Sequence, residues 1–319
     1  MKVHLWGTRG SLPTPLDAQE VRNKIAIALV QAGGRHFADR EAALQWMTSA
    51  LPFEVAGGFG GNTSCVQLDH GGDEYVLCDA GSGLRVFGNR VLAERGGRPG
   101  VYHLVMSHVH WDHIMGFPFF TPAFIPGNRI RIYGCHDKLE TAFRRQHGAP
   151  SFPVDFDALG ASIEFVKLDV GRTVDIAGFA VTPKLQLHAG DSYGYRFERD
   201  GKSVIYSTDS EHKPDDLQQT KEFVDFFRGA DIVIFDAMYS FAEAISVKED
   251  WGHGSNVSGV EICQMAEVKH LVLFHHEPMN DDARIAATLA ESRRLEQITR
   301  DRRPKLRVTS AYDGLELTP

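Results

Sequence analysis

The sequence predicts a layered α/β fold, and three observations lead to that prediction. Short apolar runs rich in β-branched and aromatic residues recur along the 319 residues, and most end in Gly, Asp, Ser or His. Stretches with the helical spacing of apolar residues lie between some of these runs. The chain is 43% hydrophobic and 24% charged, which is ordinary for a globular protein with a sizeable core. Strands that alternate with helices indicate layers of sheet and helix.

The apolar runs predict strands in chain order, beginning at the N-terminus. They cover residues 2–6, 64–68, 75–78, 103–106, 130–133, 203–206, 231–235 and 271–274. A helix is predicted over 256–266, where Val260 and Cys263 fall on its apolar side. Another is predicted over 281–300, where Ile285 and Leu289 recur at helical spacing.

Residues 16–56 predict a helical hairpin inserted between two strands. Asp17 followed by Glu20 resembles the capping box that begins a helix. An apolar stripe follows and ends at two glycines: Val21, Ile25, Ala28 and Leu29, then Gly33 and Gly34. A second helix is predicted over 39–51, where Pro52 stops it. The hairpin could add packing, form a dimer contact or cover a nearby site as a lid, and the sequence leaves these alternatives open.

Charge and cysteine usage limit the classes of protein to which this chain can belong. The formal charge is −8, so the chain as a whole lacks the basic footprint of a nucleic-acid-binding protein. The four cysteines are scattered without a CxxC pair, which is typical of buried thiols in a reducing compartment. The first residues lack the apolar stretch of a signal peptide, and no run approaches the roughly 18 apolar residues of a membrane span. We therefore expect a cytoplasmic protein.

The stretch SHVHWDHIMG, residues 107–116, concentrates metal-ligating side chains in a few positions. His108 and His110 are two apart, so on an extended segment they project to the same side and can reach one ion. Asp112 and His113 follow where the chain must turn, so they point elsewhere and can serve a second ion. Imidazole and carboxylate donors suit zinc, with iron or manganese as alternatives.

The motif HVHWDH resembles the HxHxDH signature of the metallo-β-lactamase fold, and further motifs follow the order expected for that family. They are GTRGSLP (7–13), GGNTSC (60–65), LCDAGSGLR (77–85), GYRFE (194–198), YSTDSE (206–211), GHGS (252–255), LVLFHHEP (271–278) and AYDGLE (311–316). The set is similar to the branch of phosphoribosyl cyclic phosphodiesterases and, more distantly, ribonuclease Z. The resemblance implies a four-layer αββα sandwich, classed as α/β or in some schemes α+β, formed by a single domain over residues 1–319.

The resemblance also implies which residues hold two metal ions. His108, His110 and His188 would hold the first ion, although His188 alone could be a core histidine. Asp112 and His113 would hold the second ion together with His275 or His276. The resembling enzymes place this histidine directly after the strand, which favours His275.

Two carboxylates and a further histidine complete the implied site. Asp209 would bridge both ions, although a residue after a strand could also be a plain turn or cap residue. Asp79 would orient a ligand histidine. His253, in WGHGS, would donate a proton to the leaving group or stabilise charge on the phosphoryl oxygens. A loop histidine that holds the start of the following helix is the alternative for His253.

The predicted function is a metal-dependent hydrolase, in which a hydroxide activated by two divalent ions attacks a small cyclic phosphodiester. A different ester class (lactone or thioester), a mononuclear-iron persulfide oxidoreductase and a non-catalytic binding module are the alternatives. RNA is disfavoured because residues 14–58 carry four Arg or Lys against five Asp or Glu. The expected partner is a small-molecule substrate, not a membrane or nucleic acid, and a homodimer stays open. Phe143, Arg144, Arg145 and Phe152 could line a substrate pocket or pack in the core.

Overall fold

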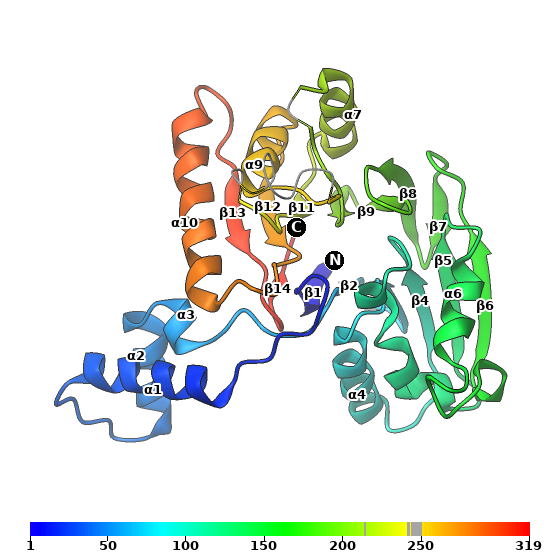
Figure 1. Ribbon diagram of the computed structural model, residues 1–319, viewed down its shortest axis with the longest axis horizontal. Helices are drawn as coiled ribbons and strands as arrows, with labels where there is room; N and C mark the ends of the chain where they lie inside the picture. Colours follow the sequence, from blue (N-terminus) through cyan, green and yellow to red (C-terminus); the bar gives the residue numbers. More distant parts are fainter. Residues whose placement is uncertain (214, 241–242, 244–250) are drawn as a thin grey trace.

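The computed structural model describes residues 1–213, 215–240, 243 and 251–319, and it contains two seven-stranded sheets that face each other (Figure 1). The first sheet has the order β14 (Glu316–Leu317), β1 (Lys2–Gly7), β2 (Cys65–Asp69), β3 (Glu74–Cys78), β4 (Val101–Val105), β5 (Arg129–Gly134) and β6 (Ser162–Lys167). The second has the order β13 (Arg307–Ser310), β12 (His270–Phe274), β11 (Ile232–Asp236), β10 (Lys202–Ser207), β9 (Ser192–Arg199), β8 (Phe179–Gln186) and β7 (Val174–Ile176). Every strand predicted from the sequence is present.

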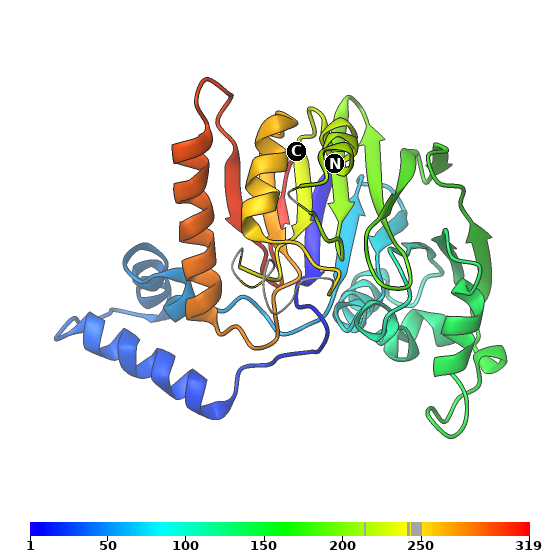
Figure 2. The ribbon, with the colours of Figure 1, turned by 45° about the horizontal axis from the view of Figure 1, so that its top comes forward.

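Helices cover the outer face of each sheet (Figures 1 and 2). The first sheet is covered by α4 (Gly83–Arg95), α5 (Trp111–Ile114), α6 (Leu139–Gln146) and the 3-10 turns η1 (Phe117–Phe119), η2 (Thr121–Phe124) and η3 (Phe156–Ala158). The second is covered by α7 (Leu217–Phe227), α9 (Asn256–Met265) and α10 (Asp282–Thr299). These layers confirm the predicted four-layer αββα sandwich. Within the described residues, no helix combines the length and the apolar character that crossing a membrane requires.

Among the residues that the structure describes, three apolar cores hold the four layers together, because the central strands bury both of their faces. On β12, Val272 and Phe274 point into the core between the sheets. Leu271 and Leu273, which alternate with them, pack against the helices of the second sheet. Side chains on both faces of such a strand are apolar, which explains why its sequence reads as a continuous apolar run.

The strand directions bring distant residues to one edge of the sandwich. Strands β10, β11 and β12 are parallel neighbours, and so are β3 and β4, so their carboxyl ends lie at common edges. Three residues that follow these strands have positive φ: Asp79 at 60°, Asp209 at 47° and His275 at 61°. Positive φ is uncommon outside glycine, and such strain is kept where it aims a side chain.

The predicted hairpin lies between β1 and β2 and consists of α1 (Ala18–Ala32), α2 (Arg40–Ala50) and the short α3 (Phe53–Ala56). The capping box is present, since the Asp17 side chain accepts from the Glu20 N–H and the Glu20 side chain accepts from the Asp17 N–H. Both views show α1 and α2 projecting beyond α10, away from the sheets (Figures 1 and 2). No residue of α1 or α2 is buried, and Leu29 keeps 67% of its surface exposed. The lid and the dimer contact stay predictions.

We expect the stability of the fold to fall on acidification, in part through His270 at the start of β12. Burial, with a smaller effect of Arg307, lowers its pKa to about 4. Below its unfolded pKa near 6.5 the unfolded chain binds a proton that the folded chain excludes. The stabilisation is therefore complete above pH 6.5 and is lost as the pH falls toward 4. Between pH 7 and pH 5 this amounts to about 2 kcal/mol. The free energy of unfolding in urea, measured at both pH values, should change less between them in His270→Gln than in the wild type. An equal change in the two proteins would contradict this role.

Candidate metal centre

The HVHWDH loop leaves the end of β4 and places its donor side chains by two different local structures. His108 and His110 lie on the non-helical segment before α5, with their ring centroids 4.5 Å apart. Asp112 and His113 lie on the single helical turn α5 and are buried. The loop therefore separates its donors into two pairs, as the change from extended to helical backbone predicts.

The first group of donors consists of His108, His110 and His188, whose candidate ligand atoms all lie within 4.8 Å of one another. His188 follows β8, and its Nε2 lies 3.1 Å from His110 Nδ1. The Nδ1–H of His188 donates to the Gly252 carbonyl at 2.7 Å, which turns Nε2 toward the group. His110 is solvent-exposed, so the group is open on that side.

The second group consists of four buried side chains: Asp112, His113, Asp209 and His275. The Nε2 atoms of His113 and His275 lie 3.1 and 3.2 Å from Asp112 Oδ2. The same two atoms both lie 3.3 Å from Asp209 Oδ1. Two carboxylates and two imidazoles thus converge on one buried position.

Asp209 lies between the two groups. While its Oδ1 faces His113 and His275, its Oδ2 lies 3.6 Å from His108 Nε2 and 3.8 Å from His188 Nε2. Each carboxylate oxygen therefore faces a different set of imidazoles. This is the arrangement that a bridging ligand needs, and the bridging role that the resemblance implies for Asp209 stays a prediction.

Asp79 orients the His113 ring of the second group through a network of hydrogen bonds. Its Oδ2 accepts from His113 Nδ1, the Ser107 hydroxyl and the Tyr206 hydroxyl, each at 2.7 Å. Its Oδ1 accepts from the Ser107 N–H, also at 2.7 Å. These bonds fix the His113 ring with Nε2 directed at the donor group, which is the orienting contact predicted for Asp79.

The electrostatics of the site fit a bound cation. Burial, reinforced by His113, lowers the pKa of His108 well below its usual value, so this imidazole is in the neutral form that ligates metals. Burial opposes the charge on His113 too, but Asp112, Asp209 and Asp79 outweigh it and raise the pKa of His113. Among the described residues, the buried Nε2 atom of His108 has no hydrogen-bond partner. Uncommitted imidazole nitrogens beside buried carboxylates are a donor set that a divalent metal would satisfy.

His253 lies beside the second group and is held by a carboxylate that the sequence reading missed. Its Nδ1 donates to Asp236 Oδ2 at 2.9 Å, and its ring lies 5.1 Å from those of His188 and His275. Burial alone would lower the pKa of His253, but Asp236 outweighs it and raises the pKa to about 9. The start of α9 is capped by Ser255, which accepts from the Ser258 N–H.

Asp236 ends β11 and is fully buried. Its Oδ2 also accepts from the N–H groups of Ser210 and Gly254. In the sequence, the feature that could have indicated Asp236 is its position at the end of an apolar run. That run forms the strand beside the one that leads to Asp209. A single aspartate after an apolar run is too common a pattern to single out.

The two consecutive histidines after β12 have different surroundings. His275 lies in the second group and is fully buried. His276 points elsewhere, because its Nε2 donates to the Ala311 carbonyl at 2.9 Å and its ring packs against Phe59. The geometry favours His275 as the ligand, and the assignment of each donor to a metal stays a prediction.

Paired substitutions test this choice. His275→Ala should lose about half of the bound metal and nearly all activity, because it removes a donor from the second group. His276→Gln should retain the metal but lower the unfolding temperature, since it disturbs a buried hydrogen bond. Metal content by mass spectrometry and thermal unfolding measure both effects, and metal loss in His276→Gln alone would reverse the assignment.

Comparison with known proteins places this site in a family. A model described as the β-lactamase superfamily domain matches residues 74–276. An uncharacterized protein of Mycobacterium leprae is 26% identical over 203 residues, which is 60% of this chain and 66% of that protein. Ribonuclease Z of Archaeoglobus fulgidus is 33% identical over 268 residues, which is 67% of this chain and 81% of the enzyme.

Solved structures of low sequence identity share the fold. The metallo-β-lactamase fold protein YhfI of Bacillus subtilis superposes with a TM-score of 0.64 at 17% identity, over 99% of this chain and 98% of that one. A diphosphatase of the PhnP family gives 0.60 at 21% identity, over 100% and 97% of the two chains. Zinc-bound PqqB of Methylobacterium extorquens gives 0.63 at 16% identity, over 100% of both chains. The chain therefore belongs to the β-lactamase superfamily and is related to ribonuclease Z, and it shares the metallo-β-lactamase fold with these solved structures.

Proposed function

We propose that this protein is a metal-dependent phosphodiesterase that cleaves a small, cyclic phosphodiester. The observation that carries the proposal is the position of Asp209, whose two carboxylate oxygens face two separate groups of histidines. His108, His110 and His188 would hold one divalent ion, zinc or else manganese or iron. Asp112, His113 and His275 would hold the other, with Asp209 shared between them.

Two such ions, when bound, would make a water nucleophilic near neutral pH and would offset negative charge on a phosphoryl group. The protein's own residues would hold the metal-ligating side chains in position. Asp79 fixes the His113 ring, and the Gly252 carbonyl fixes the His188 ring. These contacts hold the donors in place before any substrate arrives, so the site needs little rearrangement during the reaction.

His253 is the residue that we assign to the leaving group. The Asp236 carboxylate raises its pKa to about 9, so the ring carries a proton at neutral pH. Because Nδ1 donates to Asp236, Nε2 is the nitrogen that can pass a proton to a departing alkoxide. Asp236 keeps the ring in this orientation and offsets its charge.

The complete second group supports hydrolysis over the alternatives. A mononuclear-iron persulfide oxidoreductase needs fewer donors than Asp112, His113, Asp209 and His275 supply together. A binding module without catalysis would have no need of the oriented His253. The relationship to ribonuclease Z supports phosphodiester chemistry rather than lactone or thioester chemistry.

A small substrate fits the chain better than RNA does. The inserted hairpin has no excess of positive charge, and the arginine-rich end of α10 is partly committed within the fold. Arg300 bonds to Glu296 along the helix, and Arg293 donates to the Val308 carbonyl. Glu296 offsets the charge of Arg300, and the bond to Val308 holds Arg293 against the fold, so this end of α10 is a poor match for a long polyanion.

A substrate panel tests the proposal. Metal-reconstituted protein should hydrolyse bis(p-nitrophenyl) phosphate and cyclic phosphodiesters, and a chelator-stripped sample should not. The same preparation is offered a lactone, a thioester and glutathione persulfide, with oxygen consumption followed for the last. Faster turnover of any of these than of every phosphodiester would overturn the proposed substrate class.

A further inference from the structure

A cavity of about 700 Å³ opens beside the metal centre, and its size is within the roughly 300–1,000 Å³ of small-molecule sites. Val109 and Trp111 line it, and they alternate along one loop with the donors His108, His110 and Asp112. Consecutive Cα atoms are only about 3.8 Å apart, so the loop that holds the donors also bounds the cavity, while none of the donor side chains lines it. His110 belongs to the first donor group and Trp111 lines the cavity, and these neighbours in the loop are both solvent-exposed.

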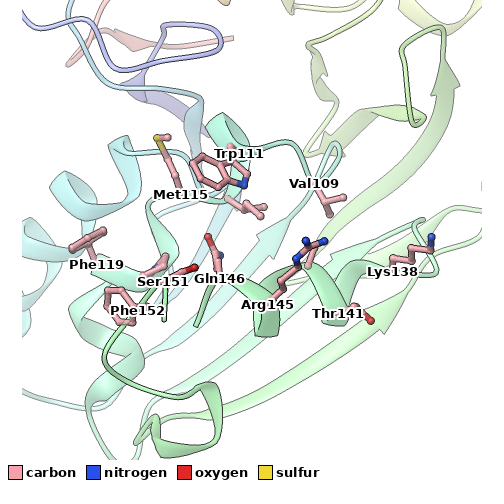
Figure 3. Close-up of a pocket in the computed structure, with 13 residues that line it drawn as sticks. Val109, Trp111, Met115, Phe119, Lys138, Thr141, Arg145, Gln146, Ser151 and Phe152 are labelled. Atoms are coloured by element: carbon pink, nitrogen blue, oxygen red, sulfur yellow. The ribbon is translucent and has the colours of Figure 1, made fainter. Parts of the chain in front are cut away.

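Helix α6 forms the floor of the cavity through one of its faces. Lys138, Thr141, Ala142, Arg145 and Gln146 recur at intervals of three and four residues and line the cavity. Leu139 and Phe143 lie on the opposite side of the helix, buried in the core. Figure 3 shows the side chains of Arg145 and Gln146 rising from the helix toward the loop that carries Val109 and Trp111.

Two polar groups that line the cavity, the exposed Arg145 guanidinium and the buried Gln146 amide nitrogen, lack a protein partner among the described residues. Arg145 forms no ion pair with the described residues, whereas its neighbour Arg144 bonds to Glu140 and Asp157. The Gln146 Nε2 atom is buried and has no hydrogen-bond partner within the described part of the chain. A buried amide donor without an acceptor is costly, so a ligand that brings an acceptor would be favoured.

The apolar walls offer flat ring surfaces. Trp111 keeps 77% of its surface exposed, and its indole contacts no other ring among the described residues. Phe119 and Phe152 form the other end of the cavity, with their rings nearly perpendicular and their centroids 5.7 Å apart. Exposed aromatic faces mark binding sites, because planar rings stack on them. Arg145 adds a planar cation that can stack on a ring or bond to its acceptors.

We propose that this cavity binds the organic group esterified to the phosphate and selects a planar ring that carries hydrogen-bond acceptors, such as a nucleobase. Trp111 stacks on the ring, and Arg145 and Gln146 bond to its acceptors. The inference rests on the proposed phosphodiesterase function for its substrate, but the cavity's preference for a ring can be measured without turnover. Phe143 and Arg144, which the sequence grouped with Arg145 and Phe152, have no part in it.

Two substrates with the same leaving group isolate the contribution of the cavity. Thymidine 5′-(p-nitrophenyl phosphate) and methyl p-nitrophenyl phosphate both release p-nitrophenolate, so their kcat/KM ratio reports only the other substituent. We expect the thymidine ester to be favoured at least tenfold. Trp111→Ala should lower the ratio about 5- to 150-fold, the range for losing one stacked base. Arg145→Gln should lower it as well, and the controls Trp46→Ala and Arg144→Gln should leave it unchanged.

Binding to chelator-treated protein separates this inference from the proposed function. By calorimetry, thymidine 5′-monophosphate should bind more tightly than methyl phosphate, and Trp111→Ala should abolish the difference. If neither ester is hydrolysed but this binding is found, the phosphodiesterase proposal fails and the ring site stands. If both esters are hydrolysed equally well and the two phosphates bind equally, the ring site is wrong. Binding of phenyl phosphate as tight as that of the nucleotide would overturn the requirement for acceptors.

Discussion

Asp209→Ala is expected to lower phosphodiester turnover by about 10³-fold and to reduce bound metal from two ions per chain to one or fewer. The reason is geometric. Asp209 is, within the part of the chain that the structure describes, the carboxylate whose two oxygens face both donor groups, at 3.3 Å from two histidines on one side and 3.6 Å from His108 on the other. Its removal weakens both groups at once, whereas the loss of any single histidine weakens only one.

The measurement combines metal content with kcat and KM on one reconstituted preparation. Asp225→Ala, which removes an exposed carboxylate from α7, is the matched control and should behave as the wild type. Circular dichroism checks that the Asp209 variant is folded. Retention of two ions in Asp209→Ala would show that the carboxylate does not join the two groups.

His253→Ala is expected to act through the leaving group. For a phosphodiester with an alkoxide leaving group, kcat should fall by about 10²–10³-fold, because the departing oxygen is no longer protonated. For a p-nitrophenyl ester the loss should stay below about tenfold, since p-nitrophenolate leaves without a proton. Metal content should stay at two ions, because His253 is not assigned to either group.

Asp236→Asn serves as a companion to that variant. It removes the charge that holds the His253 proton, so it should show the same dependence on leaving group with a smaller loss. An equal loss for both leaving groups in either variant would indicate that His253 supports the site rather than donating a proton.

The sequence predicts the central strands well and the outer strands poorly, for a physical reason. Strands such as β11 and β12 bury both faces, so their continuous apolar runs stand out. Strands β6 and β7 lie at sheet edges with several exposed side chains, and β8 contains Pro183, so none of them reads as a buried run. The helices of the insertion were predicted through local signals, Asp17 at one start and Pro52 after one end.

The residues of the site also fall into those that the sequence could predict and those that it could not. The donors of the HVHWDH loop could be predicted because they are close in sequence and their spacing sets their direction. His188, Asp209 and His275 depend on strands meeting in space, and only the resemblance to a family linked them to the loop. Asp236 needed the structure, because its bond to His253 joins two segments with no local pattern. Arg144 and Arg145 are neighbours in sequence, and only helix geometry assigns one to the surface and the other to a cavity.

A metal titration of the chelator-stripped protein tests the proposed two-metal site directly, with the rate of bis(p-nitrophenyl) phosphate hydrolysis measured at each ratio of metal to chain. We expect activity to rise until two equivalents of zinc or manganese are bound, and we expect Asp112→Ala, which removes a donor from the second group, to stay inactive throughout. Full activity at one equivalent, or equal activity in Asp112→Ala, would contradict a shared two-metal site.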